Sequence, residues 1–139
     1  MATTSNLPDS VISHVSLGTN DYPRAKAFYD TVLATLQIGC VMDFDGGAGY
    51  GRKFPEFWIQ SPHDGGRASV GNGVHISFLA NSINEVDAFH AKALELGAKD
   101  EGKPGYRPEY TPEYYAAFVR DLDGNKIEAM LMVQEGGKG

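Results

Sequence analysis

The sequence predicts an α+β fold built from two similar modules, each consisting of one strand, one helix and three further strands. The first observation is an internal repeat, because His14-Val15-Ser16-Leu17 returns 61 positions later as His75-Ile76-Ser77-Phe78. The second is that a helix start and an apolar helix stripe follow each copy at the same shift. The third is the length of 139 residues, which suits one domain with a shared core. We therefore expect a single domain over residues 1–139, with module one at about 10–62 and module two at about 73–133.

Module one is expected to open with a strand, since polar and apolar side chains alternate over residues 11–18. Asn20-Asp21 supplies N-cap oxygens and Pro23 suits a first helical turn, so a helix is predicted from there to about Leu36, with Gly39 ending it. Its apolar stripe has spacings of three and four: Ala25, Phe28, Val32, Leu36. Three short strands are expected at 40–44, 48–52 and 56–60.

Module two follows a Gly- and Ser-rich linker at residues 61–72 and repeats the opening strand at 74–80. Ser82 and Glu85 form a capping-box pattern at the start of a helix that Gly97 is expected to end. Residues 101–115 are a proline-punctuated, tyrosine-rich segment that module one lacks. Strands at 115–119 and 126–132 then form a hairpin around residues 121–125, with Asp-Gly as the turn signal.

Charge and composition exclude several classes of function. The formal net charge is −6 and no basic stripe is present, which disfavours nucleic-acid binding. No apolar run is long enough for a membrane span, and residues 1–10 lack the pattern of a secretory signal. The single cysteine, Cys40, cannot form an internal disulfide and fits a reducing compartment. We expect a cytoplasmic protein that binds neither membranes nor nucleic acid.

Strand parity places both repeat histidines away from the helices. His14 and His75 alternate with branched and aromatic residues that a helix would cover, so each histidine is expected on the opposite face of its sheet. Glu128 in the last strand likewise alternates with the apolar residues Ile127, Ala129 and Leu131, so it is also expected on the face away from the helix. Two imidazoles and one carboxylate could thus converge, and this donor set suits Fe(II), Mn(II), Zn(II) or Ni(II). The alternative is that this face of the sheet is exposed to solvent and carries no metal site.

Three segments carry a resemblance to a known family: ISHVSLGTNDYPRAKAFYDTVL (residues 12–33), GVHISF (73–78) and AAFVRDLDGNKIEAM (116–130). At these residues the chain resembles the vicinal oxygen chelate superfamily, the glyoxalase/bleomycin resistance/extradiol dioxygenase group. The resemblance implies two βαβββ modules forming a cup-shaped pseudo-barrel around a divalent metal. It also implies a homodimer, in which modules are either exchanged between chains or not.

Carried over residue by residue, the resemblance implies His14, His75 and Glu128 as metal ligands. The place that matches Glu128 in module one is Trp58, whose indole cannot ligate a metal. The chain is therefore more similar to three-ligand extradiol dioxygenases and fosfomycin-resistance thiol transferases than to four-ligand glyoxalase I enzymes. The segment at 106–115 is acidic, with Arg107 as its one cation, which departs from the basic set of the fosfomycin transferases.

Two functions are expected from these observations. The first is a divalent-metal-dependent lyase, isomerase, transferase or dioxygenase that acts on a small oxygen-chelating molecule. The metal acts as a Lewis acid, and Glu56 is the candidate general base. The second is a metal-free drug- or metabolite-binding protein similar to bleomycin-resistance proteins, which the net charge also allows, and a scaffold without activity is a third possibility. The side chains expected to contact the small molecule are Trp58, Tyr50, Tyr115 and Arg107.

Overall fold

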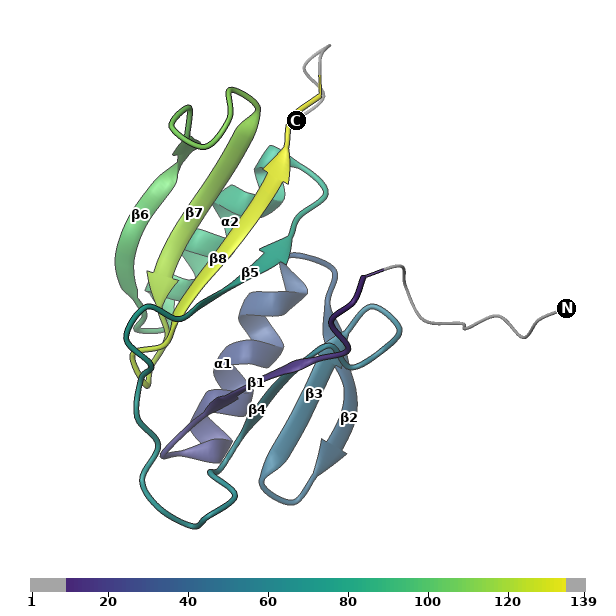
Figure 1. The fold of residues 1–139 in the computed structure, drawn as a ribbon, viewed down its shortest axis with the longest axis vertical. Coiled ribbons are helices and arrows are strands. Elements are labelled where there is room, and N and C mark those ends of the chain that lie inside the picture. The colour runs from purple at the N-terminus through teal and green to yellow at the C-terminus, as the bar shows by residue number, and fades with distance from the viewer. Residues whose placement is uncertain (1–9, 135–139) are drawn as a thin grey trace, which may run out of the picture.

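The computed structural model describes residues 10–134, which form two modules with the expected order of elements (Figure 1). Each module contains one four-stranded sheet, with strand orders β1-β4-β3-β2 and β5-β8-β7-β6. The predicted α+β fold of two βαβββ modules is confirmed, although the sheets are not closed into a barrel. The predicted domain also covers residues 1–9 and 135–139, which lie outside the described residues.

Module one holds the elements β1 (Val15–Gly18), α1 (Tyr22–Ala34), β2 (Gly39–Phe44), β3 (Gly47–Gly51) and β4 (Phe57–Gln60). The side chain of Asp21 caps α1 by accepting a hydrogen bond from the Arg24 N–H, and the predicted apolar stripe is buried. The expected end of the helix at Gly39 is wrong. The chain turns at Gln37, whose φ of 63° is left-handed, and Gly39 already begins β2.

Strand β1 begins at Val15, four residues later than predicted. The cause lies in its parallel partner β4, where Val15 pairs with Phe57 and the Val15 N–H donates to the Glu56 carbonyl. Pro55 precedes this point and has no N–H for a ladder. As a result His14 lies just outside the paired part of the sheet.

Module two holds β5 (His75–Leu79), α2 (Ile83–Glu95), β6 (Lys99–Tyr106), β7 (Tyr114–Arg120) and β8 (Lys126–Met132). The predicted cap is confirmed, since the Ser82 hydroxyl accepts from the Glu85 N–H. Strand β6 includes residues 101–106 of the proline-punctuated segment, for which no strand bounds were predicted. Pro104 is tolerated because β6 is an edge strand whose pairing with β7 is irregular on both sides of Gly102.

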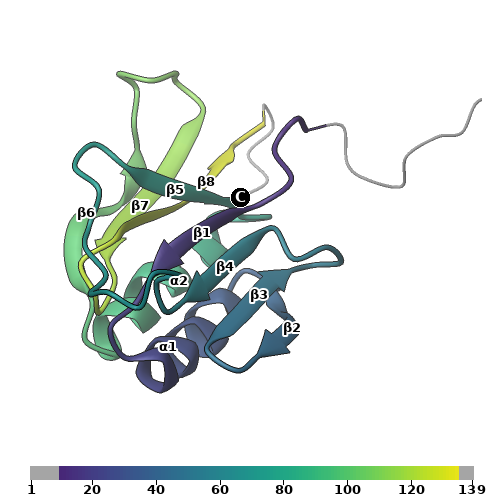
Figure 2. The same ribbon diagram turned by 60° about the horizontal axis from the view of Figure 1, so that its bottom comes forward.

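Both helices lie on the same side of the two sheets, and β1 and β5 are the strands of the two sheets that lie toward the centre of the molecule (Figures 1 and 2). The buried apolar residues of the two modules form one cluster, in which the rings of Phe57 and Phe78 meet edge to face at 5.0 Å. The modules therefore share one core. Neither of the two helices within residues 10–134 is long and apolar enough to cross a membrane.

The turn between β7 and β8 of module two holds module one by side-chain hydrogen bonds. The Tyr29 hydroxyl of α1 donates to Asp121 Oδ2 at 2.5 Å, and Asn125 Nδ2 donates to the Gly18 carbonyl at 3.3 Å. Asp123 Oδ1 accepts from the Asn20 N–H at 3.0 Å. This turn fixes the position of β8 relative to module one.

Candidate functional site

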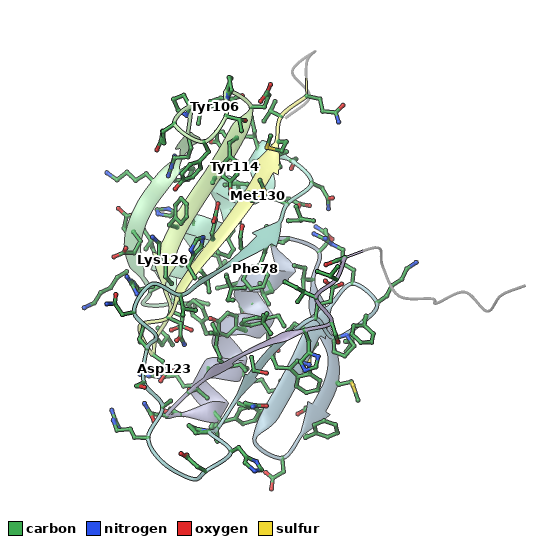
Figure 3. All side chains as sticks on the ribbon, in the orientation of Figure 1. Phe78, Tyr106, Tyr114, Asp123, Lys126 and Met130 are labelled. Carbon is green, nitrogen blue, oxygen red and sulfur yellow. The ribbon has the colours of Figure 1, made fainter. Side chains whose placement is uncertain are left out.

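The side of each sheet turned away from the helices is called the open face. On the second sheet it carries the histidine of β5 and the carboxylate of β8, because Glu128 pairs in register with Ser77 on one side and with Phe118 on the other. Tyr114 and Lys126 lie on the same face by alternation along β7 and β8, where Figure 3 labels them.

The Glu128 carboxylate is buried and held at both oxygens. Its exposed fraction is 1%, its Oε1 lies 2.9 Å from His75 Nε2, and its Oε2 accepts a hydrogen bond of 2.6 Å from the Tyr114 hydroxyl. The His75 side chain keeps 43% of its surface exposed. The pair therefore has a buried anionic end and an imidazole that solvent or a ligand can reach.

The Glu128 carboxylate also affects the pKa of the Tyr114 hydroxyl. Burial raises the pKa of Tyr114 to about 12, and the hydrogen bond to Glu128 and its charge act in the same direction. At neutral pH the Tyr114 hydroxyl is therefore a neutral donor that keeps the carboxylate oriented toward His75.

Positively charged side chains gather beside this pair. The His75 ring meets the Phe118 ring at 6.0 Å, the Lys126 Nζ lies 5.1 Å from the centre of that ring, and the Arg107 guanidinium carbon lies 5.4 Å from it. Arg107 also donates to the carbonyls of Gly105 and Lys103. The predicted contact residue Arg107 thus packs against Phe118, the same ring that His75 meets.

His14 is not brought to the other two predicted ligands. It is exposed, and its Nδ1 lies 2.9 Å from the hydroxyl of the adjacent Ser13. Within residues 10–134, no three His, Cys, Asp or Glu side chains approach one another closely enough to hold a metal ion. One copy of the chain thus presents His75 and Glu128 together and His14 apart.

The strand register gives Trp58 the place in module one that Glu128 has in module two. Trp58 pairs with Ser16 of β1 as Glu128 pairs with Ser77 of β5. Its indole N–H donates to the Pro55 carbonyl at 3.1 Å, and its ring stacks on Phe44 at 5.7 Å. The open face of the first sheet is therefore aromatic where that of the second is polar.

Glu56 and His75 line one cavity of about 400 Å³ at the seam between β1 and β5. Arg52 lies in the same lining and ties the modules together by donating to the carbonyls of Leu36 and Leu79. The remaining wall includes apolar side chains from both modules, among them Phe57 and Phe78. This cavity brings the candidate base Glu56 to the same space as His75.

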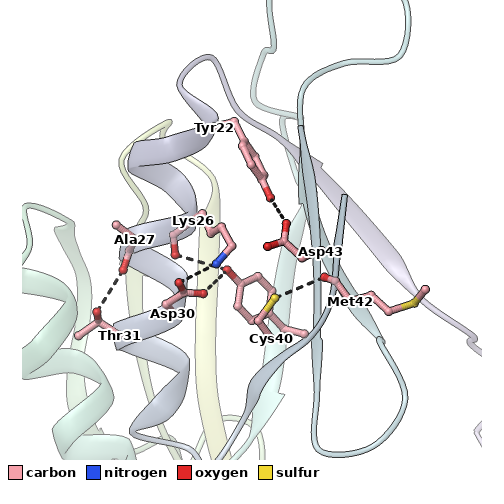
Figure 4. A network of polar contacts seen from close by, with 9 residues as sticks. Tyr22, Lys26, Ala27, Asp30, Thr31, Cys40, Met42 and Asp43 are labelled. Atoms are coloured by element: carbon pink, nitrogen blue, oxygen red, sulfur yellow. Dashed lines mark hydrogen bonds and ion pairs between the residues drawn. The ribbon is translucent and has the colours of Figure 1, made fainter. Parts of the chain in front are cut away.

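Two residues expected to contact a small molecule, Tyr50 and Tyr115, lie on the helix side of their sheets instead. Tyr50 is buried, and its hydroxyl donates to Asp30 Oδ1 at 2.8 Å within the polar network between α1 and the first sheet (Figure 4). The Tyr115 hydroxyl donates to Asp87 of α2 at 2.7 Å. Both side chains therefore pack beneath the sheets, and the open face does not include them.

Sequence reasoning missed Tyr114 and Phe118, whose side chains do lie on the open face. A signal was present, because residues two apart share a face and Phe118 alternates with the buried apolar Ala117 and Val119. The prediction began β7 at Tyr115 and chose the wrong member of the pair Tyr114-Tyr115. A shift of one residue exchanges the two faces.

The chemistry of the donor pair fits a divalent metal. Imidazole and carboxylate are common ligands of such ions at about 2.0–2.2 Å, and two such ligands at a right angle are about 3 Å apart. The observed 2.9 Å between His75 Nε2 and Glu128 Oε1 is a hydrogen-bond distance, so an ion bound by both atoms would replace the proton that they share. His75 and Glu128 could therefore bind one ion without a large movement of either strand.

Residues 11–129 match the sequence profile of the Glyoxalase/Bleomycin resistance protein/Dioxygenase superfamily. Because this match covers most of the chain, the protein belongs to that superfamily. A search of curated proteins found no match to the chain.

Solved structures agree with this assignment. The chain is 40% identical to a glyoxalase/bleomycin resistance protein from Albidiferax ferrireducens T118, with a TM-score of 0.78 over 87% of this chain and 98% of that one. It shares the fold of a lactoylglutathione lyase from Agrobacterium tumefaciens at 24% identity and a TM-score of 0.60, over 89% and 95% of the two chains. A glyoxalase-related enzyme from Fulvimarina pelagi is similar at 15% identity and a TM-score of 0.67, over 95% and 96%.

Proposed function

We propose that this protein is a divalent-metal-dependent enzyme that acts on a small oxygen-chelating molecule, with His14, His75 and Glu128 as the ligands. The observation that carries the proposal is the buried Glu128 carboxylate, oriented by Tyr114 and in contact with a half-exposed imidazole. A bound Fe(II), Mn(II), Zn(II) or Ni(II) ion would supply Lewis-acid polarisation of a substrate oxygen. Trp58 occupies the fourth ligand position of a glyoxalase I-like set, so the lyase activity of that class is not proposed.

The chain's own residues have distinct roles in this proposal. Tyr114 holds the carboxylate in place, and Trp58 with Phe44 offers a flat apolar surface on the opposite sheet. Glu56 faces the cavity that His75 also lines, which suits a base that moves a proton on a bound molecule. Glu56→Gln is therefore expected to abolish turnover and to leave metal content unchanged.

The proposed functional unit is a cytoplasmic homodimer. Exposed apolar side chains on the open faces, including Phe44, Leu79 and Met132, support association of two copies. The separation of His14 from the other two ligands within one chain supports a site that a second copy completes. Light scattering coupled to gel filtration tests the dimer, and a monomer at micromolar concentration would contradict it.

The metal proposal is tested by elemental analysis of the purified protein and by its melting temperature with each added ion. A specific ion should bind in stoichiometric amount and raise the melting temperature, and His75→Ala should lose both effects. Protein without any stoichiometric ion, and without a rise in melting temperature for any of the four ions, would overturn the proposal.

Mixed dimers show which chain supplies His14. A refolded mixture of His14→Ala and His75→Ala chains should regain about one intact site in four if the ligands come from different copies. It should regain none if all three ligands come from one chain, because every site then lacks one histidine.

A second candidate is a metal-free metabolite-binding protein. The Trp58–Phe44 stack on the open face favours this function, because parallel rings bind flat or cationic molecules without an ion. Quenching of Trp58 fluorescence by an aromatic ligand, equal in wild type and in His75→Ala, would support it over the metalloenzyme.

A further inference from the structure

A second cavity meets the site at His75. It has a volume of about 340 Å³ and lies between the end of the inter-module linker and the β7–β8 ends. Its lining includes His75, Arg120 and Lys126 together with Gly71, Asn72 and Gly73. His75 is thus a common wall of this cavity and of the larger one that Glu56 lines.

The lining of this cavity is basic, although the protein is acidic. Among residues 10–134 no Asp or Glu lines it, while the chain as a whole carries a formal charge of −6. Lys126 has no ion-pair partner within residues 10–134, and its Nζ is placed over the Phe118 ring. A cation that is kept free of carboxylates next to a candidate site is a ready partner for an anion.

Arg120 is held in place by contacts outside the cavity lining. Its Nε lies 3.5 Å from Glu101 Oε2, and its Nη1 donates to the Gly124 carbonyl at 3.1 Å. These two contacts use part of the guanidinium and fix its direction, which leaves further N–H donors in the fork. The fixed Arg120 and the free Lys126 therefore form one basic wall.

The linker supplies a second set of donors. Gly73 has a left-handed φ of +90°, and the turn before it closes through a hydrogen bond from the Val74 N–H to the Gly71 carbonyl. The N–H groups of Asn72 and Gly73 donate no hydrogen bond to any group within residues 10–134. Successive free N–H groups in such a turn can bind an oxyanion together with the neighbouring cations.

From these observations we infer that the substrate of the proposed enzyme carries an anionic oxygen group, a carboxylate or a phosphonate-like group, which binds in this basic cavity. This inference rests on the proposed function, because only an enzyme has a substrate. The binding of the anion itself does not require a metal. The apolar part of the same molecule would extend past His75 into the larger cavity, whose wall includes Phe57, Phe78 and Leu79. The substrate class is therefore a small amphipathic acid.

The test is a titration of the metal-free, full-length protein, followed by amide NMR. The probes are acetate, methylphosphonate and the neutral isostere acetamide. Both anions should shift the amide signals of Asn72 and Gly73 saturably, with millimolar dissociation constants, and acetamide should not. Tighter binding of methylphosphonate than of acetate would assign a phosphonate-like group, and the reverse order would assign a carboxylate.

Three variants complete the design. Lys126→Met should weaken anion binding about tenfold through the loss of one charge-assisted hydrogen bond, and Lys126→Arg should retain it. Lys53→Met changes the net charge equally at an exposed lysine that does not line this cavity, and should bind as wild type does. The inference is overturned if no saturable shift occurs, if acetamide gives the same shifts, or if Lys126→Met binds as tightly as Lys53→Met.

The outcome separates this inference from the proposed function. A protein that takes up a divalent ion but shows no anion shifts keeps the proposed function and loses the anionic substrate. A protein that binds the anions but no metal keeps the anion site and loses the metalloenzyme.

Discussion

The imidazole of His75 and the carboxylate of Glu128 are in contact across the first and last strands of one module, with 2.9 Å between Nε2 and Oε1. The parallel pairing of β5 with β8 sets this contact, because Ser77 and Glu128 are in register and His75 lies two residues before Ser77. The backbone ladder therefore brings the pair together before any ligand binds.

Removing the charge of Glu128 without changing its shape is expected to weaken metal binding and preserve the fold. In Glu128→Gln the amide oxygen can still accept from the Tyr114 hydroxyl, but the anionic ligand is lost. Affinity for the bound ion, measured by competition with a coloured chelator, should fall at least about tenfold. Glu56→Gln is the matched control and should bind the ion as wild type does; equal affinities in both variants would contradict the assignment of Glu128.

The unfolding free energy is expected to fall at alkaline pH because five tyrosines have raised pKa values. Burial is the main cause at each, and a neighbouring carboxylate acts in the same direction. The pKa is raised to about 12 at Tyr22, Tyr114 and Tyr115, and is raised further at Tyr29 and Tyr50.

The sign follows from proton linkage. Between pH 10, where an unfolded tyrosine ionises, and pH 12, the folded state binds more protons than the unfolded state. The stability linked to these tyrosines is therefore fully present below about pH 10 and is lost as the pH rises toward 12. Urea unfolding at a series of pH values measures this loss, and a stability that does not change up to about pH 11.5 would contradict it.

The link from α1 to the β7–β8 turn is expected to stabilise the contact between the modules. Tyr29→Phe removes the donor to Asp121 Oδ2 and should lower the free energy of unfolding by about 1 kcal/mol or more, because the acceptor is buried. Tyr106→Phe, at an exposed residue of β6, should change it by less than about 0.5 kcal/mol. Chemical denaturation distinguishes the two, and equal midpoints would refute a role for the link.

Gly49 is expected to be required for the position of Trp58. A Cβ at Gly49 would lie 2.7 Å from Trp58 Cζ2 and 2.9 Å from Pro55 Cβ, so Gly49→Ala must displace the indole. We expect a change in the emission of Trp58, the one tryptophan of the chain, and a loss of about 1–3 kcal/mol. A Cβ at Gly39 meets nothing within 4 Å, so Gly39→Ala should leave the emission unchanged. Identical spectra from the two variants would show that the indole is not held against Gly49.

Much of the fold could be predicted because the repeat, the caps and the periodicity agree. Asp21 and Ser82 cap the helices as expected, and the α1 stripe is buried. The module pattern predicted a strand equivalent to β6 but not its position, since a glycine- and proline-containing edge strand with irregular pairing has neither the composition nor the alternation of a regular strand.

The site could be predicted in part. The faces of His75 and Glu128 followed from alternation within long, regular strands. The choice of Tyr115 over Tyr114 depended on one residue of register, which propensity does not determine. The separation of His14 depends on how two sheets are placed relative to each other, and no pattern within either strand encodes that.

The equivalence of Trp58 and Glu128 has a consequence for how such a protein diversifies. Main-chain pairing with Ser16 and Ser77 holds Trp58 and Glu128 in place. The strand pairing therefore does not depend on which side chain each of the two positions carries. One repeat has come to hold an indole there and the other an anion, within the same architecture. A single substitution at either position can therefore change the chemistry of the open face without changing the topology of the sheet.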